Sequence, residues 1–194
     1  MVQAVWTHGT IPRQLQWSIV VLISKGGGDY GEIGLLELIW KVLEWIMDHC
    51  LDAIELHDCL HGCSANHRTG TVVIKAKLVQ QLLYLELKPF YGVFLDLKKA
   101  FNSMDRDRCI LILEGYGVGP RMIRLIWTYW RNANMVCRAS GNYGTPFKAG
   151  RGVTQGGLLS AKLFNILADA VANKWLQELR EGGELPHERR MTAR

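Results

Sequence analysis

The sequence lacks any apolar run that approaches the roughly 20 residues needed for a membrane-spanning helix. Its longest apolar run, near residues 17–23, has a length that suits a buried strand. The N-terminal residues also lack the basic start and the apolar stretch of a secretory signal. We therefore expect an intracellular protein that does not interact with membranes and whose five cysteines are reduced thiols.

Acidic residues are absent from residues 115–168, although the whole chain has 18 of them. The basic residues of this stretch are Arg121, Arg124, Arg131, Arg138, Lys148, Arg151 and Lys162. Because the whole chain carries only +5, the remainder is net acidic. Aromatic residues such as Trp127, Tyr129 and Trp130 lie between the cations. A positive segment with stacking side chains is typical of a nucleic-acid partner. A solvated basic face over core aromatics is the alternative.

The composition, 48% hydrophobic and 21% charged, is that of a folded globular chain. Apolar periodicity predicts helices at residues 35–56, 71–88, 106–115, 121–132 and 160–180, and a helical turn at 97–105. Strands are predicted at 18–24, 91–96, 135–140 and 145–149, with the last two joined as a hairpin. We therefore predict an α+β fold with helices packed on a small mixed or antiparallel sheet.

The first segment that could carry chemistry is V-F-L-D-L-K-K-A-F at residues 93–101. Asp96 ends the predicted strand 91–96, and a carboxylate at the end of a buried strand can hold a hard cation. The alternative is that Asp96 caps the helical turn that follows.

The second segment is glycine-rich, G-V-T-Q-G-G-L-L-S at residues 152–160, and precedes a predicted helix. Glycines let a backbone approach a flat or charged ligand, and a helix start offers free N–H groups to an anion. The alternative is a plain turn between a strand and a helix.

Together these segments resemble reverse transcriptases. F-L-D-L-K-K-A-F at residues 94–101 is similar to the first palm motif of that family, and G-V-T-Q-G-G-L-L-S-A-K-L-F-N at 152–165 to the second. Residues 11–30, 35–44 and 115–120 resemble the fingers of reverse transcriptases from retroelements without long terminal repeats. The resemblance implies a fingers-like region at 1–90 and a partial palm with an intervening fingers segment at 91–180. Residues 181–194 mix charged residues and proline without periodicity, so we predict a disordered tail there.

The resemblance also implies a reaction and its partners. In this family a DNA primer on an RNA template attacks a deoxynucleoside triphosphate, with two Mg²⁺ ions between nucleophile and leaving group. Asp96 corresponds to the first metal-binding carboxylate, and the backbone carbonyl of Leu97 to a further metal contact. The other motif positions correspond to nucleotide-binding residues.

Phe101 corresponds to the aromatic residue that lies under the sugar and excludes a 2′-hydroxyl, although a core phenylalanine is the alternative. Gln155 and Gly156 correspond to the loop that packs against the incoming nucleotide and the template. Lys25 corresponds to a fingers lysine that contacts the triphosphate, with an ordinary hairpin turn as the alternative.

Several positions depart from the family pattern. Gly31 and Glu32 stand where the family has an arginine after the fingers tyrosine, and Asn102 stands where it has an aspartate. Leu158 and Ala161 replace prolines of the second motif. No Tyr/Phe-x-Asp-Asp sequence follows residue 180. We therefore expect an incomplete, inactive polymerase site. The alternatives are a non-catalytic nucleic-acid-binding remnant of a retroelement, or a decayed product without function.

Histidines and cysteines also crowd residues 57–67. Their spacing matches no common zinc pattern, so no zinc site is predicted there.

Overall fold

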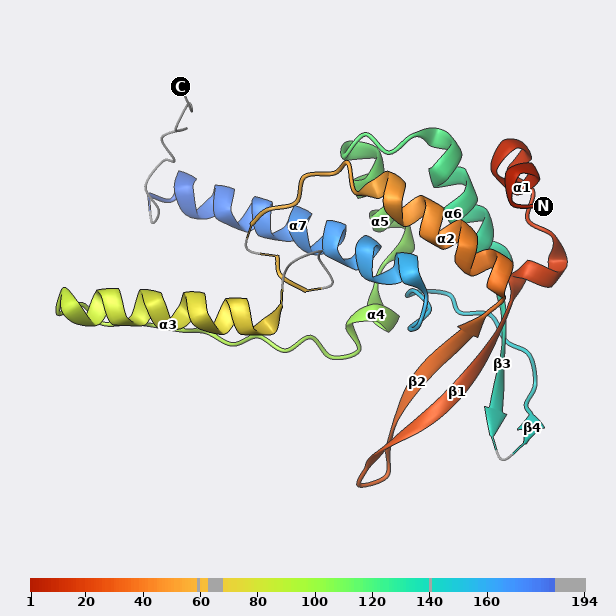
Figure 1. Cartoon of the computed structure of the whole chain (residues 1–194), viewed down its shortest axis with the longest axis horizontal. Coiled ribbons are helices and arrows are strands. Elements are labelled where there is room, and N and C mark those ends of the chain that lie inside the picture. The colour runs from red at the N-terminus through yellow and green to blue at the C-terminus, as the bar shows by residue number, and fades with distance from the viewer. Residues whose placement is uncertain (59, 63–67, 140, 184–194) are drawn as a thin grey trace.

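The computed structural model of the chain describes residues 1–58, 60–62, 68–139 and 141–183, arranged as in Figure 1. The described helices are α1 (Val2–His8), α2 (Leu38–Leu51), α3 (Thr69–Leu85), α4 (Ala100–Ser103), α5 (Arg106–Gly115), α6 (Pro120–Asn132) and α7 (Leu158–Glu181), with a short 3-10 helix at Arg13–Gln16. The strands are β1 (Trp17–Gly26), β2 (Asp29–Leu36), β3 (Asn134–Ala139) and β4 (Asn142–Tyr143). None of these helices has the length and apolar character to cross a membrane.

The strands form one mixed sheet in the order β2-β1-β3-β4. β1 pairs antiparallel with β2 and parallel with β3, and β3 pairs antiparallel with β4. In Figure 1 the β1–β2 hairpin and the β3–β4 turn extend away from a group of helices formed by α2, α5, α6 and α7. The α+β fold with a small mixed sheet is therefore confirmed.

Strand β2 replaces the start of the helix predicted at residues 35–56. Leu35 and Leu36 pair with Ile19 and Ser18 of β1, so that the helix begins only at Leu38 and ends at Leu51. Leu36 is buried whereas Leu35 is exposed, which is the alternation of a strand with one face on the core. Two adjacent leucines suit the apolar face of a helix better than the strict alternation of a half-buried strand, so the sequence pattern favours a helix at this point.

The core lies between the helices and is built on amphipathic spacing. Helix α6 buries most of its apolar side chains and leaves Arg121, Arg124 and Arg131 exposed, at spacings of three and seven residues that keep them near one face. Trp40 of α2 stacks on Tyr129 of α6, with ring centroids 3.9 Å apart and planes 13° from parallel. The other fully buried large side chains are Leu43, Met47, Leu113, Leu125, Ile126, Leu163 and Ile166. Tyr129 and Trp130 are thus core residues. This agrees with the alternative in which the aromatics of the basic stretch lie in the core beneath a solvated basic face.

The strand predicted at residues 91–96 is not formed. These residues have no regular secondary structure, and Phe94 is 98% exposed. A strand needs a neighbouring strand to satisfy its backbone groups, and the sheet of β1 to β4 does not extend to this segment. Figure 1 shows the segment returning from the end of α3 to α4, outside the sheet. The expectation that Asp96 ends a central strand is therefore wrong.

Helix α3 confirms the helix predicted at 71–88 but not its packing. The apolar residues expected to line one side of a core are exposed, and none of its 17 residues is buried. Leu82 is 60% exposed and Leu85 77% exposed. The periodicity therefore identified a helix whose apolar side chains have no cover among the described residues.

The second half of the chain follows the prediction closely. Helices α5 and α6 and strand β3 occupy the predicted positions within one residue, and α7 begins two residues before residue 160. The strand predicted at 145–149 is reduced to one bridge between Phe147 and Met135, while β4 lies at Asn142–Tyr143. The predicted disordered tail lies mostly outside the described residues.

The different packing of two leucines can be tested by truncation. Leu125→Ala in α6 should lower the free energy of unfolding by about 2–5 kcal/mol, because Leu125 is only 1% exposed. Leu85→Ala in α3 removes the same atoms from an exposed position, and its effect should stay within about 0.5 kcal/mol. Urea denaturation followed by circular dichroism measures both, and equal losses would contradict the exposure of α3.

Candidate functional site

Three segments distant in sequence meet at one place. The turn at residues 101–104 is joined to the glycine-rich loop by Gly152 N–H donating to the carbonyl of Met104 (2.8 Å) and Val153 N–H to that of Phe101 (3.0 Å). Strand β2 joins the same loop, because Gly34 N–H donates to the carbonyl of Gln155 (2.7 Å). The end of the first segment singled out in the sequence, at Phe101, is therefore adjacent to the second segment, and β2 lies beside the second.

Close contacts favour glycine at two of these positions. Gly152 has φ of 78°, and a Cβ there would lie 2.6–2.8 Å from backbone atoms of Asn102. A Cβ at Gly34 would overlap the methyl group of Thr154. Larger side chains would push the loop away from both the turn and the strand.

The side chains of Glu32 and Asn102 add a further link. The amide of Asn102 donates a hydrogen bond to Glu32 Oε1, between β2 and the turn. Both residues depart from the family pattern, and they contact each other. They line a cavity of about 140 Å³ together with Gly34, Thr154 and Gln155.

The structure brings together some of the predicted nucleotide-binding residues. Gln155 lines this cavity, and Gly156 follows it on the exposed loop. Phe101 lies at the junction of turn and loop, half-buried, with its ring centroid 5.1 Å from that of Phe164. Its side chain packs partly against the core.

Other predicted residues lie apart from this cavity. Asp96 and Leu97 are exposed on the irregular segment and do not line it. Lys25 is exposed near the tip of the β1–β2 hairpin, and its side chain lies across Gly31, where a Cβ would be 2.8 Å from Lys25 Cε. Lysine thus fills the space beside the position where the family has arginine.

The described residues do not complete the expected Mg²⁺ site. Two-metal displacement needs several carboxylates, and no three His, Cys, Asp or Glu residues of the described part of the chain are grouped to hold a metal ion. Asp96 supplies one carboxylate. Of the histidine- and cysteine-rich loop, residues 59 and 63–67 lie outside the described residues.

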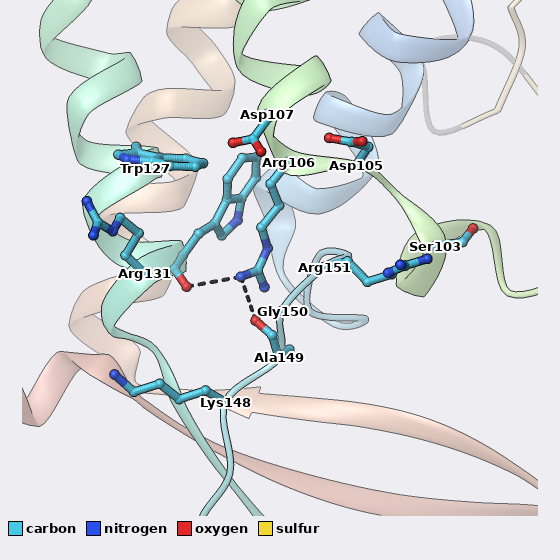
Figure 2. A pocket seen from close by; sticks show the side chains of 11 residues that line it. Ser103, Asp105, Arg106, Asp107, Trp127, Arg131, Lys148, Ala149, Gly150 and Arg151 are labelled. Atoms are coloured by element: carbon cyan, nitrogen blue, oxygen red, sulfur yellow. Dashed lines mark hydrogen bonds between the residues drawn. The ribbon is translucent and has the colours of Figure 1, made fainter.

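The cations of the acid-free stretch are divided among several elements. Arg131, Lys148 and Arg151 line a second cavity of about 520 Å³, together with Arg106 (Figure 2). The others lie elsewhere: Arg121 and Arg124 are on the exposed face of α6, Arg138 is exposed on β3, and Lys162 pairs with Asp52.

Arg106 is a residue of the site that the sequence pattern did not indicate. It lies outside the acid-free stretch and between Asp105 and Asp107, so that counting charges passes over it. Its Nε donates to the carbonyl of Gly152 (2.8 Å), and its Nη1 donates to those of Trp130 (3.0 Å) and Ala149 (2.7 Å). Arg106 thereby connects α5, the end of α6 and the segment that leads into the loop.

Glu44 is a second residue that the sequence pattern did not indicate. Its carboxylate binds the first turn of α7. Its Oε2 accepts from Leu158 N–H (2.9 Å) and its Oε1 from Trp40 Nε1 (3.1 Å). The residue before α7 is Gly157, which has no side chain to cap the helix, so Glu44 satisfies one of its free N–H groups. Burial raises the pKa of Glu44 to about 7. The sequence signal was a carboxylate on the apolar stripe of α2.

Alanine in the loop tests the close contact at Gly152. Gly152→Ala should lower the free energy of unfolding by roughly 1–3 kcal/mol, because its φ is positive and its Cβ would meet the backbone of Asn102. Gly150→Ala is the matched control two residues earlier, where a Cβ has open space. Thermal unfolding measures the effect of both substitutions on stability. An equal loss for Gly152→Ala and Gly150→Ala would contradict the close contact at Gly152.

The pH dependence of stability tests the environment of Glu44. A folded pKa of about 7 against 4.5 unfolded means that the folded state binds the proton more tightly. The free energy of unfolding should therefore fall by about 3 kcal/mol as pH rises from 4.5 to 7. Glu44→Gln should remove this part of the pH dependence. Glu37→Gln removes the same charge from an exposed position just before α2 and should leave the wild-type profile.

Comparison with known proteins agrees with the arrangement of the motifs. Residues 23–188 match the sequence model of the family described as reverse transcriptase (RNA-dependent DNA polymerase). Over 167 residues, 81% of the chain, it is 23% identical to the transposon TX1 uncharacterized 149 kDa protein of Xenopus laevis. Over 90 residues, 46% of the chain, it is 31% identical to the retrovirus-related Pol polyprotein from type-1 retrotransposable element R2 of Nasonia vitripennis. The matches cover 13% and 9% of these relatives. Because the family match covers most of its length, this chain belongs to the reverse transcriptase family.

Proposed function

We propose that this chain contributes the nucleotide-binding part of an RNA-directed DNA polymerase. The observation that carries the proposal is the junction of three segments, in which backbone hydrogen bonds join the turn at Phe101, the loop at Gln155 and strand β2. A nucleotide site needs such convergence, because its groups must be held in register by a rigid support. The ligands would be a deoxynucleoside triphosphate and a DNA primer paired with an RNA template.

The roles that we propose for individual residues come from the family resemblance. Gln155 and Gly156 would contact the incoming nucleotide and the template base from the exposed loop. Phe101 would restrict the space at the sugar while its ring rests on Phe164. Lys25, on the extended hairpin, would supply a mobile positive charge to the triphosphate.

Nucleotide transfer is not proposed for residues 1–194 alone. Mg²⁺ is the cofactor expected for this chemistry, and it would supply the charge that stabilises the attacking and leaving oxygens. Asp96 and the carbonyl of Leu97 would be ligands of such an ion, but they provide only part of its coordination. We therefore propose binding of nucleotide and nucleic acid without transfer by these residues.

A non-catalytic nucleic-acid-binding protein is the second candidate function. The cavity that holds Arg106, Arg131, Lys148 and Arg151 favours it, because this cavity does not include Gln155 or Phe101. Such a protein would bind RNA or an RNA–DNA hybrid, whether or not a deoxynucleotide is present.

Deoxynucleotide binding distinguishes the two functions. Residues 1–194 with an RNA template, a DNA primer and Mg²⁺ should bind the complementary deoxynucleoside triphosphate in equilibrium dialysis. Gln155→Ala should weaken this binding by about five- to tenfold through loss of a polar contact. Gln177→Ala, near the exposed end of α7, is the control and should leave binding unchanged. Hybrid binding without any deoxynucleotide binding would favour the second function.

Primer extension tests whether these residues complete the reaction. With labelled primer and all four deoxynucleotides, residues 1–194 should give no Mg²⁺-dependent product, because one carboxylate does not hold two ions. Extension by this chain would show that its metal ligands lie elsewhere than at Asp96.

A further inference from the structure

We propose that the cavity between α5, α6 and residues 148–151 binds a phosphodiester of single-stranded nucleic acid, with one base against Trp127. The proposal extends the proposed function to a second cavity. It rests on the proposed function only because it takes the ligand to be a nucleic acid. The cavity, about 520 Å³, has the size of a small-ligand site. It adjoins the cavity of Gln155, because Arg106, Ala149 and Arg151 line both.

Arg106 is a fixed cation at the centre of this site. Three backbone carbonyls hold its guanidinium group, and it makes no ion pair among the described residues. No described residue accepts a hydrogen bond from Nη2, the remaining nitrogen. A half-buried guanidinium group that is held in place without a carboxylate is suited to an oxyanion, because its donors are already oriented.

The rim adds positive charge from separate elements. Figure 2 shows Arg106 between Arg131 and Lys148 on one side and Arg151 on the other. The acids of the rim are Asp105 and Asp107, and Asp105 is engaged at the start of α5, where it accepts from Arg108 N–H (3.0 Å). Four cations against two acids leave the cavity net positive. An anionic ligand is therefore favoured over a cationic or neutral one.

Trp127 determines which anion fits. Its half-buried indole lines the same cavity as Arg106 and lies next to Arg131 in Figure 2. An aromatic face beside phosphate-binding cations binds an unpaired base by stacking, and bases in a duplex are not free to stack in this way. A single strand can contact both the cations and the indole of Trp127, whereas free phosphate can contact only the cations.

Matched double substitutions test the site. The pair Arg131→Gln with Lys148→Gln removes two charges from this cavity without touching the cavity of Gln155. The pair Arg121→Gln with Arg124→Gln removes two charges from α6 outside both cavities. Fluorescence anisotropy with a labelled oligouridine of about eight nucleotides gives the dissociation constants at about 50–200 mM KCl. Melting temperatures establish that the variants are folded.

The two pairs should differ. The cavity pair should weaken binding about tenfold at low salt and reduce the slope of log affinity against log salt by about 1.4, or 0.7 for each lost phosphate contact. The α6 pair should change affinity by less than about threefold. Equal losses in both pairs, or none in the cavity pair, would overturn the site and indicate diffuse attraction to the positive stretch.

A second ligand tests the base. An abasic oligonucleotide of the same length should bind wild-type protein about tenfold more weakly than oligouridine. Equal affinities, or full competition by inorganic phosphate at equal concentration, would overturn the assignment to a single strand. A cavity that binds oligouridine in a chain that binds no deoxynucleotide would contradict only the proposed function.

Discussion

The contact between the backbones of Gly152 and Asn102 is the constraint on which the site depends. Gly152 and Val153 donate to the carbonyls of Met104 and Phe101, so the turn and the loop are joined with no side chain between them. From this junction the loop turns past Gly34 and continues into α7, whose first N–H groups face Glu44. Separating turn and loop by one methyl group would shift Gln155 relative to Phe101. The nucleotide site that we propose exists only while this contact is kept.

Buried polar groups hold the surroundings of this junction. Glu44 satisfies the start of α7 from within the core, and Arg106 collects the carbonyls of Trp130, Ala149 and Gly152 on the other side. A buried polar group without a partner costs more than a missing surface contact, so these bonds specify one arrangement of the elements. The hydrogen bond that Asn102 donates to Glu32 adds a polar contact between β2 and the turn.

The exposed region from α3 to residue 97 contrasts with this. Apolar residues that usually occupy interiors, such as Leu82, Leu85 and Phe94, lie open to solvent. The segment that holds Asp96 lacks the strand partner that would order it. The proposed metal-binding role of Asp96 therefore rests on the sequence resemblance alone. The proposed nucleotide-binding role of the loop at Gln155 rests on the resemblance and on the hydrogen bonds that join this loop to the turn and to β2.

The sequence alone determined the elements with strong local signals. The 3.6-residue period identified α3, α6 and α7, the β-branched run before Gly26 identified β1, and the ordered motifs identified the family. Local periodicity does not specify which strand pairs with which, so it predicted a strand at 91–96 and missed β2. The role of Glu44, the convergence on Arg106 and the junction at Gly152 were decided only by the tertiary structure. Each depends on contacts between residues more than 40 positions apart, and such contacts form only when the helices pack and the chain brings distant backbone groups within hydrogen-bonding distance.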